Sequence, residues 1–137
     1  MTDTNRSVID PSPVPLRQDH EFPAATARDG WRYHHIGIPT QTPRPGETHL
    51  PDFGLFKSGF ETSPYGIEWM RYEKGSPIPE LIRTVPHIAF VVDNLETALV
   101  GKEILTDINS PSEGVRVAMI MDNGAPIELM EFRAQQE

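Results

Sequence analysis

Short runs of alternating apolar and polar residues recur between residues 33 and 132 and predict a protein built mainly from β-strands. Residues 33–39 set the pattern, because Ile36 and Ile38 fall on one face of the segment and His35 falls on the other. Alternation of this kind is typical of a strand with one buried face. The expected strands are residues 33–39, 55–60, 66–72, 87–92, 104–108, 115–121 and 126–132.

One segment, residues 93–100, has the pattern of a helix instead. Asp93 is placed to cap its amino terminus, Glu96 follows three residues later as in a capping box, and Gly101 can end it. The apolar residues of this segment share one face, as in an amphipathic helix; they are Leu95, Ala98 and Leu99. Turns are expected at residues 111–114 and 122–124.

Residues 1–30 differ in composition from the rest and are rich in Pro, Asp, Arg, Thr and Ser. Four prolines would interrupt any regular element in this stretch, namely Pro11, Pro13, Pro15 and Pro23. We therefore expect an extended or disordered arm, or alternatively an arm that wraps over the domain or over a partner subunit. The arm lacks the apolar stretch of a signal peptide. Residues 31–137 are expected to form a single domain.

The two halves of that domain repeat one order of elements. Residues 81–137 read as strand, helix, strand, strand and strand. Residues 31–80 follow the same order with the helix reduced or missing, because the Pro- and Gly-containing residues 41–47 predict a loop in its place. A repeat of this length indicates two copies of one supersecondary unit. The sequence thus predicts two β-α-β-β-β modules.

Each module opens with a histidine on its first strand and closes with a glutamate on its last strand. His35-Ile36-Gly37-Ile38 parallels His87-Ile88-Ala89-Phe90, and residues 66–72 parallel residues 126–132 with Glu68 and Glu128 in equivalent positions. Chance similarity between apolar strands would explain the matching isoleucines. It would not explain why histidine and glutamate recur at equivalent points.

The directions in which the side chains point indicate that these four polar residues form a candidate metal site. One isoleucine in each of these strands would point to the core under the helix, namely Ile36, Ile67, Ile88 and Ile127. In that case His35, Glu68, His87 and Glu128 all point to the opposite face. Two imidazoles and two carboxylates suit one divalent cation such as Zn, Ni, Co, Mn or Fe(II). His34 would face the other way and is expected to be a half-buried structural residue.

The motifs HIGI, GIEW, HIAF and IELM, in this order, resemble those of the vicinal-oxygen-chelate superfamily, which includes glyoxalases, bleomycin-resistance proteins and extradiol dioxygenases. The resemblance covers about residues 33–132 and implies an α+β fold in which paired β-α-β-β-β modules form a cupped mixed sheet. It also implies that the metal ligands are His35, Glu68, His87 and Glu128. The loop at residues 41–47 departs from the family pattern, since a helix is expected there.

Three functions are compatible with this resemblance. The leading one is a metal-dependent isomerase, epimerase or lyase that acts on a small substrate with vicinal oxygens through an enediolate-type intermediate. Glu128 or Glu68 would then be the catalytic group that moves a proton. The alternatives are an Fe(II) extradiol-type dioxygenase, against which a fourth ligand at Glu68 argues, and a non-enzymatic protein that sequesters a small molecule.

Several other side chains have a structural interpretation at least as strong as a functional one. Glu131 is expected to be an exposed strand charge, and Arg116 and Lys57 to form surface salt bridges rather than to hold an anionic substrate. A further group could line a pocket or simply pack in the core, namely Met70, Met119, Met130, Trp69 and Tyr72.

Composition narrows the partners and the compartment. The formal net charge of −8 would repel the phosphate backbone of nucleic acid. No apolar run is long enough to span a membrane. Cysteine is absent, which fits a reducing cytoplasm. A module without its helix leaves sheet surface uncovered, and we therefore expect a homodimer.

Overall fold

The computed structural model describes residues 16–133, which fall into two units, residues 16–31 and residues 32–133. The first unit contains one short helix, α2 (Ala24–Ala27). Pro23 directly precedes this helix, so the prediction that Pro23 excludes regular structure is wrong at this point. Proline lacks an N–H that the first turn would leave unpaired, and it therefore fits at a helix start. Pro11, Pro13 and Pro15 lie outside the described residues.

The second unit is an α+β fold built on one mixed sheet, as predicted, and this sheet has eight strands. Its strands, in chain order, are β1 (Arg32–Pro39), β2 (Thr48–Leu50), β3 (Leu55–Ser58), β4 (Ile67–Tyr72), β5 (His87–Val91), β6 (Glu103–Ser112), β7 (Val115–Asp122) and β8 (Ala125–Phe132). Its helices are the 3-10 helix η1 (Pro51–Phe53), α3 (Glu80–Thr84) and α4 (Leu95–Leu99).

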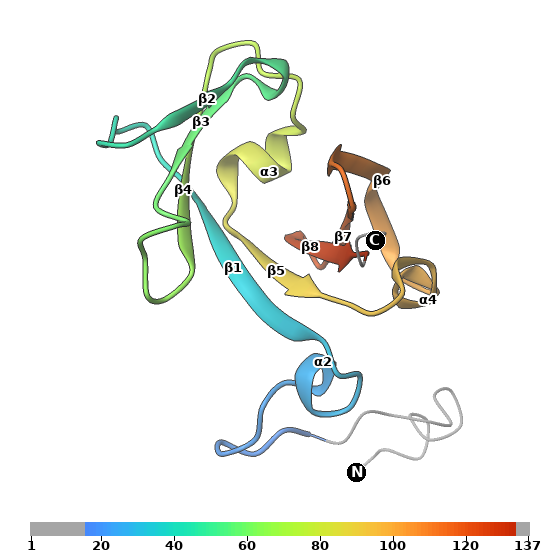
Figure 1. The fold of residues 1–137 in the computed structure, drawn as a ribbon. Helices are drawn as coiled ribbons and strands as arrows, with labels where there is room; N and C mark the ends of the chain where they lie inside the picture. Colours follow the sequence, from blue (N-terminus) through green and yellow to red (C-terminus); the bar gives the residue numbers. More distant parts are fainter. Residues whose placement is uncertain (1–15, 134–137) are drawn as a thin grey trace. The chain divides into compact units, whose positions relative to one another are not determined.

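The strand order β2-β3-β4-β1-β5-β8-β7-β6 confirms the repeat. In each half the first strand pairs in parallel with the last one, β1 with β4 and β5 with β8. The two halves join where β1 and β5 pair in antiparallel fashion. The sheet curls so that β2–β4 form one arm and β6–β8 the other, with β1 and β5 between them (Figure 1).

In-register isoleucines form one row across the outer face of this sheet. Ile36 is the partner of Ile67 on one side and of Ile88 on the other, and Ile88 in turn pairs with Ile127. All four are half-buried rather than fully buried. Since in-register neighbours point to the same side of a sheet, the residues adjacent to this row along each strand face the inside of the curl.

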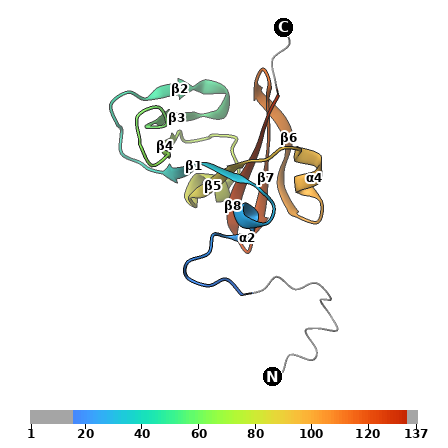
Figure 2. The ribbon, with the colours of Figure 1, turned by 60° about the horizontal axis from the view of Figure 1, so that its bottom comes forward.

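Helix α4 covers the outer face of the second module and packs against β7 and β8 (Figures 1 and 2). Leu95 on the helix and Leu129 on β8 are fully buried. Its N-cap is Asn94, whose side-chain oxygen accepts a hydrogen bond from the backbone N–H of Thr97 at 2.8 Å. The prediction of Asp93 as N-cap, with Glu96 completing a capping box, is therefore wrong. Asn and Asp cap equally well, and local sequence alone does not choose between neighbours.

Glu131 is buried, contrary to the prediction of an exposed charge. Its carboxylate accepts hydrogen bonds from Arg116 Nε at 2.7 Å and from the backbone N–H of Leu95 at 3.3 Å. Arg116 also forms a two-pronged salt bridge with Glu96. The guanidinium of Arg116 lowers the pKa of Glu131. Arg116 is thus a structural salt-bridge residue, as predicted, and it connects β7 and β8 to α4.

The first module has no helix between β1 and β2, which confirms the predicted departure. Side chains of the loop at residues 40–47 contact the outer face of its strands instead. Arg44 lies over the ring of Trp69 at 5.0 Å, and Glu47 forms a two-pronged salt bridge with Arg71 at 2.7 and 2.8 Å. The arginine stems and these ion pairs cover strand surface that α4 covers in the other module.

Strand β2 and the helices η1 and α3 were not predicted, and the predicted end of β6 came too early. The short helix α3 precedes β5, in a stretch for which the sequence indicated no regular element. Strand β6 extends past the expected end at residue 108 and includes Pro111. The pairing of β6 with β7 shifts register three times, and β6 forms one edge of the sheet.

Candidate metal centre

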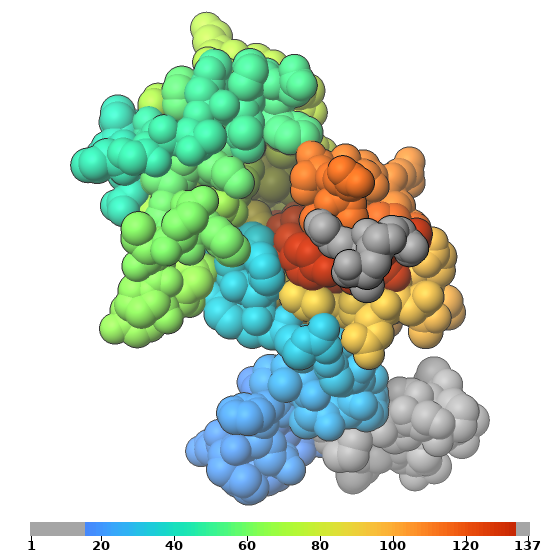
Figure 3. Space-filling view, viewed as in Figure 1, coloured from blue at the N-terminus to red at the C-terminus, as the bar shows by residue number. Residues whose placement is uncertain are grey.

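A cavity of about 640 Å³ occupies the inside of the curled sheet. Both modules line it, and so does α3 through Ile82. The space-filling view shows the hollow between the arm of β2–β4, in green, and the arm of β6–β8, in orange and red (Figure 3). Most of the lining side chains are apolar, and they include four of the five residues considered for a pocket, Met70, Met119, Met130 and Tyr72. Trp69 faces outward beneath Arg44.

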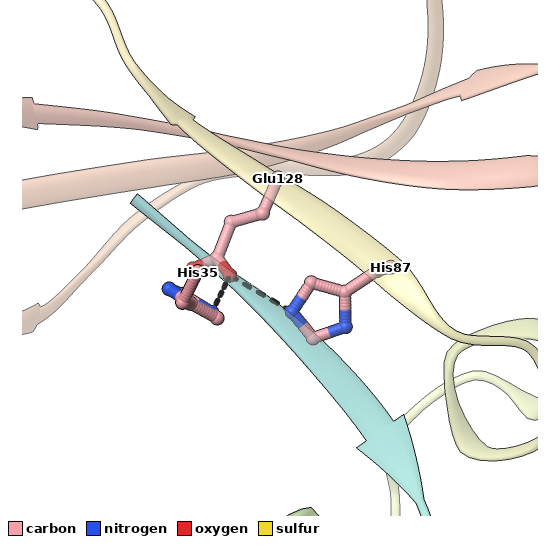
Figure 4. Close-up of side chains that lie close together, drawn as sticks. All are labelled: His35, His87 and Glu128. Atoms are coloured by element: carbon pink, nitrogen blue, oxygen red, sulfur yellow. Dashed lines mark ion pairs between the residues drawn. The ribbon is translucent and has the colours of Figure 1, made fainter. Parts of the chain in front are cut away.

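Three polar side chains converge in this cavity from three strands. The Nε2 atoms of His35 and His87 lie 3.4 and 3.2 Å from the same carboxylate oxygen of Glu128 (Figure 4). One potential ligand atom from each residue lies within 4.8 Å of the others. The side chains of His35 and His87 are only 6% and 4% exposed, and that of Glu128 is 18% exposed. The arrangement is a buried pair of imidazoles that share one carboxylate.

Glu68, the fourth predicted ligand, lies beside this group. Its carboxylate is 3.6 Å from Nε2 of His35, and its other oxygen is 3.7 Å from Nζ of Lys57. Both Glu68 and Lys57 line the cavity. Three of the four predicted ligands thus form one compact cluster, and the fourth is in contact with one of them and with a lysine.

Small residues make this convergence possible. In one row of in-register partners, Gly37 stands between Glu68 and His87; in the next row, Ala89 stands between His35 and Glu128. Ala89 is fully buried. Because Gly37 has no Cβ, the imidazole of His87 can lie directly over it. Large side chains on β4, β1, β5 and β8 can therefore lean toward one point without clashing with the strand between them.

We expect Gly37→Ala to damage the site directly. The added Cβ would overlap Cε1 of His87 and would lie 2.6 Å from its Nδ1, so the ring would have to leave its present position beside Glu128. Displacing a ligating imidazole should raise the dissociation constant for a divalent metal by at least about tenfold, a loss comparable to that caused by removing a support of a ligand. Isothermal titration calorimetry with Zn²⁺ would measure it.

The double variant Gly37→Ala/His87→Ala is the control for this prediction. Removing the imidazole leaves space for the new methyl group. Gly37→Ala should therefore lower the free energy of unfolding less in the His87→Ala variant than in the wild-type chain. Equal costs in both backgrounds, measured by urea unfolding, would mean that the ring and the glycine do not share this space.

The electrostatics of the cluster keep Glu128 ionised. Burial opposes the charge, but hydrogen bonds from His35 and His87 outweigh it and lower the pKa of Glu128 to about 2. The nearby phenol of Tyr72 behaves in the opposite way. Burial, with the negative charges of Glu128 and Glu68, raises the pKa of Tyr72, so its hydroxyl keeps its proton, which it donates to Sδ of Met70 at 3.7 Å on the cavity wall.

The alternation of side chains along residues 33–39 predicted the wrong face of β1 for His34. A β-bulge lies at this point, because Tyr33 pairs with Phe90 and His35 with Ala89, which leaves His34 as an extra residue. Consequently His34 also lines the cavity, and its Nδ1 lies 2.8 Å from Nδ1 of His35. Burial lowers the pKa of His34, and the charge of His35 adds to this effect. No sequence signal marks this bulge, since the alternation of residues 33–39 is uninterrupted.

The donor set meets the demands of a divalent cation. Neutral imidazoles and an ionised carboxylate are ligands that zinc and other first-row metals accept. Both Nε2 atoms face the carboxylate oxygen of Glu128. Among the residues that the structure describes, Nδ1 of His87 is buried without a hydrogen-bond partner, which leaves Nε2 as the atom that serves the cluster.

The fold of this chain is similar to the folds of two proteins of known structure. The chain is similar to the crystal structure of the hypothetical protein BH1468 from Bacillus halodurans C-125, with a TM-score of 0.57 and 21% identity over 78% of this chain and 98% of that one. It is also similar to methylmalonyl-CoA epimerase from Mycobacterium tuberculosis, with a TM-score of 0.50 and 18% identity over 76% and 89%. No family model and no curated protein matches the sequence.

Proposed function

We propose that this chain is a metal-dependent isomerase, epimerase or lyase of the vicinal-oxygen-chelate superfamily, acting on a small substrate with two neighbouring oxygens. The observation that carries the proposal is the convergence of His35, His87 and Glu128 inside the cavity of the curled sheet. The fold that surrounds this cluster resembles that of an epimerase, which supports the choice of reaction class.

One divalent metal, from among Zn, Ni, Co, Mn and Fe(II), would be held by His35, His87 and Glu128, with Glu68 as the fourth proposed ligand. When bound, it would act as a Lewis acid and stabilise the negative charge that develops on the substrate oxygens. The protein supplies a mostly apolar cavity, in which such charges are screened less than in water. The phenol of Tyr72, which keeps its proton, lines the same cavity.

Between the two carboxylates, Glu68 is the better candidate to carry a proton. Glu128 is held by two imidazoles, whereas Glu68 contacts one imidazole and the partly exposed ammonium group of Lys57. A carboxylate that is less tightly held can approach a substrate carbon and remove its proton.

The test combines metal analysis with proton exchange. We expect the purified full chain to bind one divalent metal and to exchange the proton next to the carbonyl of a small 2-oxo acid, 2-hydroxy acid or thioester for deuterium in D₂O, followed by proton NMR. Glu68→Gln should slow this exchange by about 10²–10⁴-fold, the usual contribution of a general base. A chain that binds no metal and exchanges no proton from any of these compounds would contradict the proposal.

A second candidate, an Fe(II) dioxygenase, is favoured by one specific observation. The compact cluster consists of two histidines and one glutamate, the ligand set typical of non-haem Fe(II) oxygenases, while Glu68 also contacts Lys57. Oxygen uptake by the Fe²⁺-loaded chain in the presence of a catechol, without proton exchange, would favour this candidate over the isomerase.

Other parts of the proposal rest on the sequence. We keep residues 1–30 as an arm and residues 31–137 as the domain, a homodimer as the working form, a small molecule as the partner, and the cytoplasm as the compartment. No helix among residues 16–133 is long and apolar enough to cross a lipid bilayer. Light scattering at micromolar concentration would test the homodimer, and a monomer would contradict it.

A further inference from the structure

We infer that His34 is a positioning residue for the metal centre, which fixes the tautomer and the orientation of His35 through a hydrogen bond between the two rings. This inference rests on the metal site proposed above. It gives a role to the extra residue of the β-bulge in β1, which the facing argument had placed on the outer surface.

The hydrogen bond constrains both rings. The two Nδ1 atoms are 2.8 Å apart, so one of them must carry the hydrogen and the other must accept it. If Nε2 of His35 gives its lone pair to a cation, the ring proton of His35 lies on Nδ1. His35 then donates to Nδ1 of His34, and His34 must be neutral with its own proton on Nε2.

The ring of His34 is itself held from two sides. Phe60, which follows β3 in the first module, stacks on it at 5.3 Å with an angle of 27° between the rings. Phe132, at the end of β8 in the second module, lies 5.6 Å away at 34°. Both phenyl rings line the cavity together with His34. The hydrogen-bond acceptor for His35 is therefore fixed in place by packing contacts from both modules.

The two candidate imidazole ligands are supported in different ways. His87 is positioned by contact with Gly37, and its Nδ1 has no hydrogen-bond partner among residues 16–133. His35 has such a partner in His34. A hydrogen bond to the outer nitrogen of a ligating histidine fixes its tautomer and raises its basicity, and loss of such a partner typically weakens metal binding by about 10–100-fold.

Two variants of the full chain separate the hydrogen bond from the packing. His34→Phe keeps an aromatic ring between Phe60 and Phe132 but removes the acceptor. His34→Asn loses the ring, but its amide oxygen stands close to the position of Nδ1 and can accept from His35. Titration calorimetry with Zn²⁺ should show a dissociation constant about 10–100-fold higher for His34→Phe and a value close to wild type for His34→Asn.

The absorption spectrum of bound Co²⁺ provides a second readout, because it reports the ligand field at the metal rather than the stability of the fold. The band should shift in His34→Phe and return toward the wild-type position in His34→Asn. Wild-type affinity in His34→Phe, or equal weakening in both variants, would overturn this inference alone. Failure of the wild-type chain to bind either metal would overturn the proposed function and this inference together.

Discussion

Replacing His87 or His35 by alanine, or Glu128 by glutamine, should each raise the dissociation constant for a divalent metal by more than about 100-fold, beyond the effect of losing a group that only supports a ligand. The three residues each offer one ligand atom, and these atoms lie within 4.8 Å of one another. Alanine removes the imidazole ligand, and glutamine replaces the charged carboxylate by a neutral amide that binds a cation more weakly. Metal affinity depends on the number of ligands and on their deprotonated state. Metal content after dialysis and calorimetric titration would measure the loss.

Two glutamine substitutions serve as controls for this set. Glu73 is exposed and pairs with His49 away from the cavity, so Glu73→Gln should leave metal binding unchanged. Glu68→Gln should weaken binding less than Glu128→Gln, because Glu68 contacts one imidazole rather than two. Full retention of metal in all three ligand variants would place the binding site elsewhere and remove the basis of the proposed function.

Leu129→Ala should lower the free energy of unfolding by about 2–5 kcal/mol, the range seen when a buried leucine is truncated. Leu129 is fully buried on β8 beneath α4, as is Leu95 on the helix itself. Removing the side chain would leave a cavity that the rigid sheet cannot fill by collapsing. Urea unfolding of the metal-free chain, followed by tryptophan fluorescence, would give the change.

Val100→Ala is the matched control for this stability effect. Val100 follows α4 directly and is 73% exposed, so its truncation should change the stability by no more than about 0.5 kcal/mol. If the two variants lost the same amount of stability, Leu129 would not be part of the packed layer between α4 and the sheet.

The sequence predicted the architecture well where a periodic pattern was repeated. The strand period of two, combined with matching histidine and glutamate positions, predicted that His35, Glu68, His87 and Glu128 would lie on one face, and all four line the cavity. The second copy of the pattern served as a check on the first. The Pro- and Gly-containing residues 41–47 likewise predicted that the first module would lack its helix, and it does.

Features that depend on a single residue or on distant partners were not predictable in this way. The bulge at His34 arises because β1 carries one more residue than β5 needs, and alternation within one strand cannot reveal a mismatch with its neighbour. Glu131 is buried because Arg116 and the amino terminus of α4 neutralise it, and both lie far away in the sequence. The alternation along β8 predicts which face of the sheet Glu131 lies on, but it does not predict which residues Glu131 contacts.

The strand order also bears on how the folded chain avoids aggregation. Because β1 and β5 occupy the middle of the sheet, its two free edges are β2 and β6. Strand β2 has only three residues, and β6 contains Pro111 and three register irregularities. Short, irregular or proline-containing edges are poor templates for adding a strand from another molecule. Fibre-like addition of strands from further copies along either edge of the described sheet is therefore disfavoured.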